Sequence, residues 1–205
     1  MFRPDDAGWM SDPLPTLAPP ELAAHLLGGS AALFPTDTLS ALASCPSQAH
    51  QLWALKHRPA EKPLILMAAN AEALLGSIGR PARPEWLAMA AWAWPGAVTL
   101  VLPAIGPVAE ALNPGGGSLG LRLPACPQAL ALLELSGPLA TTSANVSGQP
   151  PATTAEEAAR QFAAVPLLGP MPWPEAGGMA STVLAWREGG GWQVLRAGAL
   201  LPPGI

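Results

Sequence analysis

A run of hydroxyl, amide and glycine residues between positions 141 and 148 has the clearest capacity for chemistry in this sequence. It reads Thr-Thr-Ser-Ala-Asn-Val-Ser-Gly and follows Gly137-Pro138-Leu139-Ala140, which predicts the end of a short buried strand. Hydroxyl and amide groups beside a glycine can offer donors and close backbone approach to an anionic ligand. In an open α/β sheet, ligands bind at the carboxyl ends of strands. Ordinary turns use the same residue types, so the segment alone leaves a binding loop and a turn equally open.

Four further polar or cationic groups lie at expected ends of strands or helices. In chain order they are Pro35-Thr36-Asp37-Thr38, Lys56-His57-Arg58-Pro59, Arg122 within Leu119–Leu123, and Arg196 within Leu195–Gly198. Most of them have a purely structural explanation. Asp37 can cap a turn, Lys56 and Arg58 can complement the carboxyl end of a helix, and Arg196 can be a charge on an edge strand.

Arg122 is harder to explain in structural terms, because it interrupts an otherwise apolar strand. A buried charge without a partner is strongly destabilising. Arg122 therefore needs an anionic partner, which can be Asp37 or a bound anion. The sequence leaves both possibilities open.

The elements that must position these groups alternate between strands and helices. Apolar runs predict strands over 31–34, 64–67, 98–102, 119–123, 137–141, 182–186 and 192–195. Periodic segments predict helices over 21–27, 48–56, 70–75, 84–92, 128–135 and from 153 or 154 to 164. Asn70 is the expected N-cap of one helix, and a capping box, Thr153 with Glu156 or Thr154 with Glu157, begins the last. The pattern predicts one α/β domain over 20–205 with a mixed sheet, preceded by an irregular arm over 1–19.

Composition excludes several functional classes. Half of the 205 residues are hydrophobic and 12% are charged, which suits one domain with a sizeable core. The net charge is −4, and ten Lys plus Arg residues leave little material for a nucleic-acid or membrane surface. Cys45 and Cys126 have no metal-ligand spacing and predict no disulfide framework. The amino terminus does not resemble a secretory signal, and the longest apolar runs are too short to span a bilayer. A cytoplasmic protein is expected.

Together the motifs resemble the YrdC/Sua5 family, from about Leu33 to Leu200. The resemblance rests on seven motifs in the family's order: Pro35–Thr38, Lys56–Pro59, Trp94–Leu100, Leu121–Pro124, Thr142–Gly148, Ser181–Val183 and Leu195–Gly198. It implies a twisted, open, mixed α/β sheet with flanking helices, of the YrdC/RibB-like kind, with a concave face that holds the ligand. It also implies the short bacterial form, without the additional carboxyl-terminal domain of longer members.

The family's reaction joins L-threonine, bicarbonate and ATP into threonylcarbamoyl-AMP and pyrophosphate. A separate tRNA threonylcarbamoyl transferase complex then modifies adenosine 37 of tRNAs that read codons beginning with A. The resemblance implies that Lys56 and Arg58 supply the catalytic charge and, with Ser143, Asn145 and Arg196, hold ATP. Magnesium would enter with the nucleotide, so no metal site built from protein side chains is expected.

The resemblance also implies that Thr36, Arg122 and Ser181 hold threonine, with the arginine facing its carboxylate. An anion must attack the α-phosphorus of another anion, so cations and positioning are expected to supply the catalysis rather than a protein nucleophile.

One departure from the family pattern lies beside the first motif. The family continues with Tyr-Gly-Leu, whereas this chain has Ser40-Ala41-Leu42, which removes an aromatic ring beside the expected pocket. Two alternatives to threonylcarbamoyl-AMP synthesis therefore stay open. One is a paralogue that acts on another carbamoyl or acyl adenylate, and the other is a non-catalytic RNA-binding or ribosome-associated module. Weak RNA binding would show a steep salt dependence.

Overall fold

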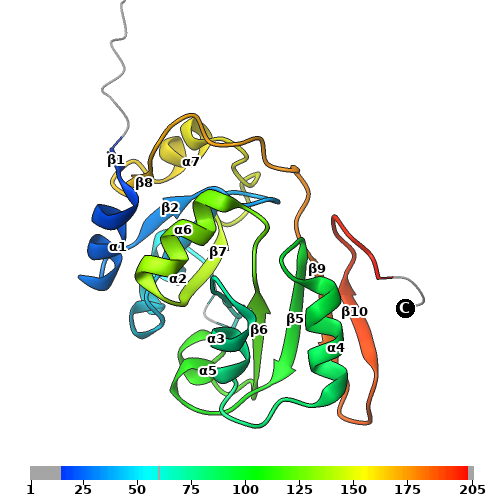
Figure 1. Cartoon of the computed structure of the whole chain (residues 1–205). Coiled ribbons are helices and arrows are strands. Elements are labelled where there is room, and N and C mark those ends of the chain that lie inside the picture. Colours follow the sequence, from blue (N-terminus) through cyan, green and yellow to red (C-terminus); the bar gives the residue numbers. More distant parts are fainter. Residues whose placement is uncertain (1–14, 60, 203–205) are drawn as a thin grey trace, which may run out of the picture.

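The computed structural model describes residues 15–59 and 61–202, which form one mixed sheet with helices on both faces (Figure 1). The ten strands of this part of the chain lie in the order β1-β8-β2-β3-β7-β4-β6-β5-β9-β10. The β4–β6 and β5–β9 pairs are parallel, whereas β3–β7, β7–β4, β5–β6 and β9–β10 are antiparallel. This arrangement confirms the mixed α/β sheet predicted from the sequence.

The bounds of the elements follow from their hydrogen bonds. The strands are β1 Thr16–Leu17, β2 Ala32–Phe34, β3 Ala41–Ser44, β4 Ile65–Met67, β5 Val98–Pro103, β6 Ser118–Arg122, β7 Leu139–Ser143, β8 Leu167–Leu168, β9 Thr182–Trp186 and β10 Trp192–Arg196. The helices are α1 Pro19–Leu27, the 3₁₀ helix η1 Pro46–Gln48, α2 His50–Lys56, α3 Ala71–Gly76, α4 Pro84–Ala93, α5 Pro107–Leu112, α6 Pro127–Ser136 and α7 Ala155–Gln161.

Alternation along the strands divides the core into two layers. Leu33, Leu42, Leu66 and Ala140 point into the larger cluster, which packs against side chains of α2, α3, α4, α5 and α7. Their neighbours in the chain point to the other face, where Leu22, Leu26, Leu132 and Leu133 bury them. Successive side chains of a strand face opposite sides of the sheet, so the two clusters are the two faces.

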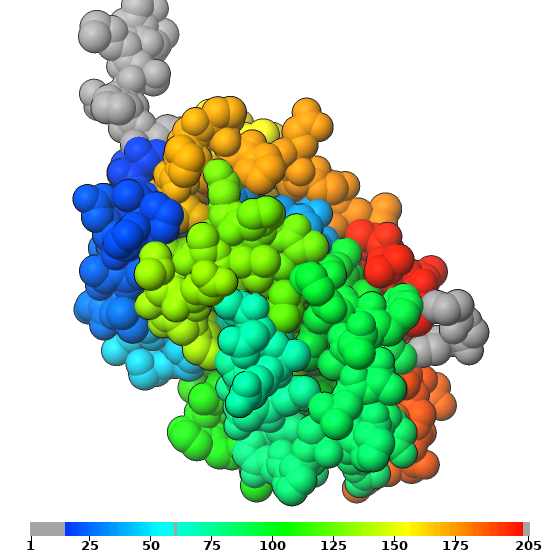
Figure 2. All heavy atoms as spheres, viewed as in Figure 1, coloured from blue at the N-terminus to red at the C-terminus, as the bar shows by residue number. Residues whose placement is uncertain are grey.

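Helices α1 and α6 cover only half of the second face. They lie side by side (Figure 1) and form a continuous surface in the space-filling view (Figure 2). Their buried side chains pack over β2, β3, β8 and the beginning of β7. The rest of that face, over β4, β5, β6 and β9, carries polar side chains and is the hollowed part described below.

Most of the predicted elements are confirmed, including both capping predictions. The Asn70 side chain accepts a hydrogen bond from Ala73 N at 2.8 Å. Of the two capping boxes left open, the structure forms Thr154 with Glu157. The final hairpin is confirmed as β9 and β10. Cys45 and Cys126 are both free thiols, in agreement with the sequence.

The short elements β3, α5, β8 and η1 escaped prediction, as did β1, which is described below. Strand β3 has the sequence Ala-Leu-Ala-Ser, which has little strand propensity of its own. It forms because β2 and β7 pair with it on its two sides. Tertiary pairing therefore decides this strand.

The expected irregular arm over 1–19 also needs correction at its end. Thr16 and Leu17 form β1, which pairs with β8, and Pro19 is already the first residue of α1. Proline suits the first turn of a helix because its missing N–H would be unpaired there. The part of the arm over 1–14 lies outside the described residues.

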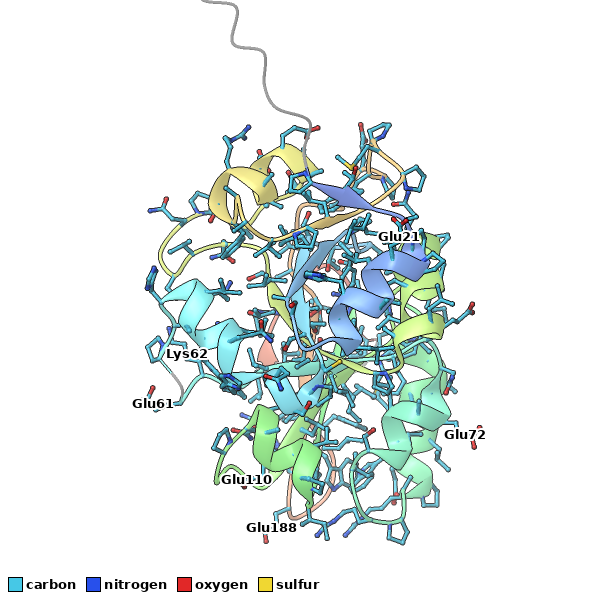
Figure 3. All side chains as sticks on the ribbon, turned by 90° about the vertical axis from the view of Figure 1, so that its left-hand side faces the viewer. Glu21, Glu61, Lys62, Glu72, Glu110 and Glu188 are labelled. Atoms are coloured by element: carbon cyan, nitrogen blue, oxygen red, sulfur yellow. The ribbon has the colours of Figure 1, made fainter. Side chains whose placement is uncertain are left out.

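Charged side chains lie mostly at the surface of the fold. The labelled side chains of Glu21, Glu72, Glu110 and Glu188 lie at its periphery (Figure 3). Among the helices that the structure describes, none is long and apolar enough to cross a membrane.

Candidate functional site

A cavity of about 640 Å³ occupies the open half of the second face of the sheet. Its floor consists of alternate side chains of the central strands: Ile65, Met67, Thr99, Val101, Gly120, Arg122, Thr141 and Ser143. Gly120 keeps this floor low, since a Cβ there would lie 2.8 Å from Cγ2 of Ile65. The floor of the cavity thus combines apolar side chains with hydroxyl groups and one guanidinium.

Strand register gathers the polar groups at two ends of the cavity. Leu100 pairs with Leu121, and Val98 pairs with Thr182, so that Thr99, Arg122 and Ser181 lie at one end. At the other end, Ile65 of β4 pairs with Thr141 of β7, and Ser143 lies two residues farther along. We call these the arginine end and the loop end.

Arg122 is 3% exposed at the arginine end and is held on several sides. Its Nη2 donates to Asp37 Oδ1 at 2.7 Å, its Nη1 donates to Thr38 Oγ1 at 2.7 Å, and its Nε donates to the Gly96 carbonyl at 3.1 Å. Of the two partners left open by the sequence, Asp37 therefore pairs with Arg122. Burial lowers the pKa of Arg122 and Asp37 opposes that shift, while an arginine remains charged in either case.

Arg196 is the second cation of the arginine end. Its Nε and Nη2 donate to the Ser181 carbonyl at 3.1 and 2.8 Å, and Nη2 lies 3.3 Å from Ser181 Oγ. The Ser181 hydroxyl is also 2.9 Å from that of Thr99. Arg196 is close enough to Arg122 to lower the pKa of the latter, which places two like charges at one end of the cavity. Such a site favours an anionic ligand.

The last motif reaches this end by a close backbone approach. Gly198 N donates to Thr182 Oγ1 at 3.0 Å, and Ala199 N donates to the Ala180 carbonyl at 3.0 Å. A Cβ on Gly198 would lie 2.2 Å from that carbonyl oxygen. Glycine is therefore required for the chain to bring Arg196 against Ser181.

Thr36 and Thr38 differ in their position relative to the cavity. The Thr36 hydroxyl donates to the Leu39 carbonyl at 2.6 Å and accepts from Thr38 N at 3.1 Å. Thr36 is buried and, within the described chain, is not among the residues that line the cavity; Thr38 is. The sequence named the first threonine of the motif, whereas the fold presents the second.

The loop end is built on the opening hydroxyl-rich segment. Ser143 Oγ donates to Asn145 Oδ1 at 2.6 Å, and Asn145 Nδ2 donates to the Val146 and Gln149 carbonyls at 3.1 and 2.9 Å. Ser143 and Asn145 both line the cavity. Of the two interpretations left open above, the segment is thus a loop at the wall of the cavity, although it also makes a tight turn.

Lys56 lies behind this loop. Its Nζ donates to the carbonyls of Ser143 and Asn145 and, at 3.2 Å, to Asn145 Oδ1. An ammonium has three donors, so these bonds occupy all of them. Lys56 is 1% exposed and, unlike Arg58, is not among the cavity-lining residues of the described chain. Burial, with the nearby charge of Arg58, lowers its pKa to about 8.

Arg58 and Lys62 bring positive charge to the loop end itself. Arg58 Nη2 donates to the Pro63 carbonyl at 3.1 Å, and burial lowers the pKa of Arg58. The Lys62 side chain is exposed (Figure 3). The Lys62 carbonyl accepts a hydrogen bond from Trp53 Nε1 at 2.9 Å. Lys62 and Thr99 were not predicted as site residues, although Lys62 closely follows the Lys56–Pro59 motif and Thr99 lies within the Trp94–Leu100 motif. Only the register and the turn after α2 bring them to the cavity.

Ser40, at the departure from the family pattern, is a cavity-lining residue with an unusual environment. It is 1% exposed, and its Oγ has no hydrogen-bond partner among the described residues. Its backbone is fixed by Ala152 and Ala144 at 3.1 and 2.8 Å. The side chain is therefore an unpaired hydroxyl, which is costly when buried.

The substitution Ser40→Ala is expected to raise the free energy of unfolding by about 1 kcal/mol, because it removes this unpaired hydroxyl. Urea denaturation would measure the change. Ser44→Ala is the matched control, because the Ser44 hydroxyl donates to the Cys45 carbonyl at 3.1 Å. Its removal should lower the free energy of unfolding by about 1 kcal/mol. A loss of stability in both variants would contradict this interpretation of Ser40.

The chain is similar to known proteins over most of its length. A family model described as Telomere recombination, Sua5/YciO/YrdC, matches residues 24–198.

A Stenotrophomonas maltophilia protein named threonylcarbamoyl-AMP synthase is 39% identical over 140 residues, which cover 65% of this chain and 75% of that protein. The structure of P. abyssi Sua5 complexed with L-threonine has a TM-score of 0.81 and 32% identity, over 88% of this chain and 54% of that chain. This chain thus spans a little over half the length of the P. abyssi protein. HypF in its phosphate- and nucleotide-bound form has a TM-score of 0.73 at 20% identity, which shows a shared fold alone.

Proposed function

Because this chain belongs to the Sua5/YciO/YrdC family, we propose that it is a threonylcarbamoyl-AMP synthase, a nucleotidyltransferase that joins L-threonine, bicarbonate and ATP. The single observation that carries the proposal is the meeting of far-separated motifs in one cavity. Arg122, Ser181 and Arg196 stand at one end, and Ser143 and Asn145 stand at the other. A triphosphate and an amino acid need such a divided, positively charged hollow.

Threonine would bind at the arginine end. Arg122 is proposed to face its carboxylate, with the hydroxyls of Thr38 and Ser181 beside it. The proposal replaces Thr36 by Thr38 as the contacting residue and gives Thr36 a positioning role, because its hydroxyl is already satisfied within the motif. A guanidinium suits a carboxylate because its parallel N–H groups match the two oxygens.

ATP would place its phosphates between the two ends, against Ser143, Asn145, Arg58 and Arg196. Arg58 and Arg196 would neutralise the repulsion between the carboxylate of the threonine carbamate and the phosphates when that carboxylate attacks the α-phosphorus. Magnesium would arrive with ATP as part of the substrate. Lys56 is proposed to act indirectly, by holding the Ser143–Asn145 loop.

The proposed reaction needs no covalent bond between the substrates and the protein. The threonine nitrogen bonds to the carbon of bicarbonate with loss of water, which gives the carbamate. A carbamate oxygen then forms a bond to the α-phosphorus, and the bond between the α-phosphorus and the oxygen that bridges it to the β-phosphorus breaks, which releases pyrophosphate. The protein's contribution is then orientation of two anions and stabilisation of the charge that develops between them. The product would pass to the transferase complex that modifies tRNA, and a cytoplasmic location stays a prediction.

Release of pyrophosphate should require all three substrates. We expect purified protein to release pyrophosphate with ATP, L-threonine and bicarbonate together, and only background amounts when any one is omitted. A coupled pyrophosphate assay and mass spectrometry of the adenylate would measure this. Release that ignores threonine would refute the proposal and favour another carbamoyl or acyl adenylate. RNA binding without any turnover would favour the RNA-binding alternative.

A further inference from the structure

Asp37 lies beside the cavity but, among the described residues, is not one of those that line it. Its side chain is 17% exposed, and its Oδ1 accepts from Arg122 Nη2 at 2.7 Å and from Ala125 N at 3.0 Å. One carboxylate oxygen therefore links the turn after β2, the end of β6 and the turn before α6. The proposed reaction gives this residue no contact with a substrate.

Arg122 depends on this carboxylate for the compensation of its buried charge and for its direction. The other acceptors around it, Thr38 Oγ1 and the Gly96 carbonyl, are neutral. In the described part of the chain, Asp37 supplies the ion pair to a guanidinium that is 3% exposed. A long side chain with several rotatable bonds is held in one position only if its partners fix it.

The bonds around Arg122 leave part of its guanidinium unused. A guanidinium has five N–H groups, and Nε, Nη1 and Nη2 each make one bond to Gly96, Thr38 or Asp37. One N–H on each terminal nitrogen is thus left over. Because Thr38 and Asp37 fix the two nitrogens separately, they also fix where these remaining groups point.

We infer that Asp37 is a positioning residue, which orients Arg122 so that its two remaining N–H groups meet the carboxylate of the amino-acid substrate. The inference rests on the proposed function for the identity of that substrate. Its structural half, that Asp37 holds Arg122 in place, can be tested without any substrate.

The backbone at Asp37 and Thr38 is held by bonds that do not involve the Asp37 side chain, although Asp37→Ala also removes the bond from Ala125 N. The Asp37 carbonyl accepts from Gly177 N at 3.2 Å and the Thr38 carbonyl accepts from Gly178 N at 3.0 Å, and both bonds are independent of the side chain. Asp37→Ala removes the carboxylate. Asp37→Asn keeps an oxygen that can accept both of the present bonds but removes the charge. Glu72→Ala, at an exposed position of α3, is the control.

The kinetic test separates positioning from general damage. We expect Asp37→Ala to raise KM for threonine between about 10-fold and 100-fold, as a misplaced binding group does. KM for ATP should stay within about twofold, and kcat at saturating threonine should change little, because uniform binding is lost. Asp37→Asn should lie between this variant and the unaltered protein, and Glu72→Ala should match the latter.

The substrate-free test follows the Nε–H signal of Arg122 by ¹⁵N NMR, assigned by its loss in Arg122→Lys. In the unaltered protein its exchange with water should be slow, and Asp37→Ala should accelerate it at least about tenfold, since local opening controls exchange. Unchanged exchange, an unchanged threonine KM, or equal rises in both KM values would overturn the inference. If Asp37→Ala does not fold, a threonine KM within twofold of normal in Asp37→Asn overturns it instead. A protein that ignores threonine altogether refutes the proposed function, while the NMR result still decides whether Asp37 holds Arg122.

Discussion

Replacing Arg122 by alanine should lower kcat/KM for threonine by about 100-fold to 1000-fold while the protein remains folded. Truncating one partner of a buried, hydrogen-bonded charge pair has effects of this size on binding. In this protein the loss includes the guanidinium offered to the substrate and leaves Asp37 without its cation. Steady-state kinetics with threonine as the varied substrate would measure the effect.

Two further variants isolate the cause of that loss. Arg122→Lys keeps a positive charge but not the planar fork, so its kcat/KM should lie between those of the alanine variant and the unaltered protein. Arg80→Ala removes an arginine from the exposed surface and should leave the kinetics unchanged. Near-normal threonine kinetics in Arg122→Ala would remove threonine binding from the role proposed for Arg122.

Replacing Lys56 by methionine should raise KM for ATP by about 10-fold to 100-fold, even though Lys56 lies behind the cavity wall. Methionine fills similar space but cannot donate to the Ser143 and Asn145 carbonyls that Lys56 now satisfies. The loop that presents Ser143 and Asn145 should then lose its fixed position. Hydrogen exchange of amides 144–147, measured without ATP, should accelerate in the variant. Unchanged protection together with weakened ATP binding would instead favour a direct contact between Lys56 and phosphate.

The same residue predicts a dependence of stability on pH. The pKa of Lys56 falls from 10.5 in the unfolded chain to about 8 in the fold, mainly through burial. Between these two pH values the unfolded chain binds more protons than the folded one, so the free energy of unfolding should rise with pH. Urea denaturation at pH 8 and pH 10 should show this rise in the unaltered protein relative to Lys56→Met. A difference that is flat or falls over that window would contradict the shifted pKa.

The local chemistry of the chain was readable from the sequence. Asn70 and Thr154 could be predicted as helix N-caps, because a capping side chain bonds to a backbone N–H only three residues farther along the chain. The final hairpin and the buried strands follow from patterns of nearby residues. The need of Arg122 for an anionic partner follows from the cost of burying a charge. These interactions span short distances along the chain or depend on one residue's own desolvation.

The partners of the site residues were decided by tertiary structure alone. Asp37 and Arg122 are 85 residues apart, and Lys56 is 87 residues from Ser143. Strand β3 exists because β2 and β7 flank it, and Thr38 rather than Thr36 faces the cavity because the turn after β2 consumes the first hydroxyl. Residue types determined which groups could bind an anion. Strand order and register determined which of them meet, because a hydrogen-bonded ladder fixes distances between segments that no local pattern in the chain encodes.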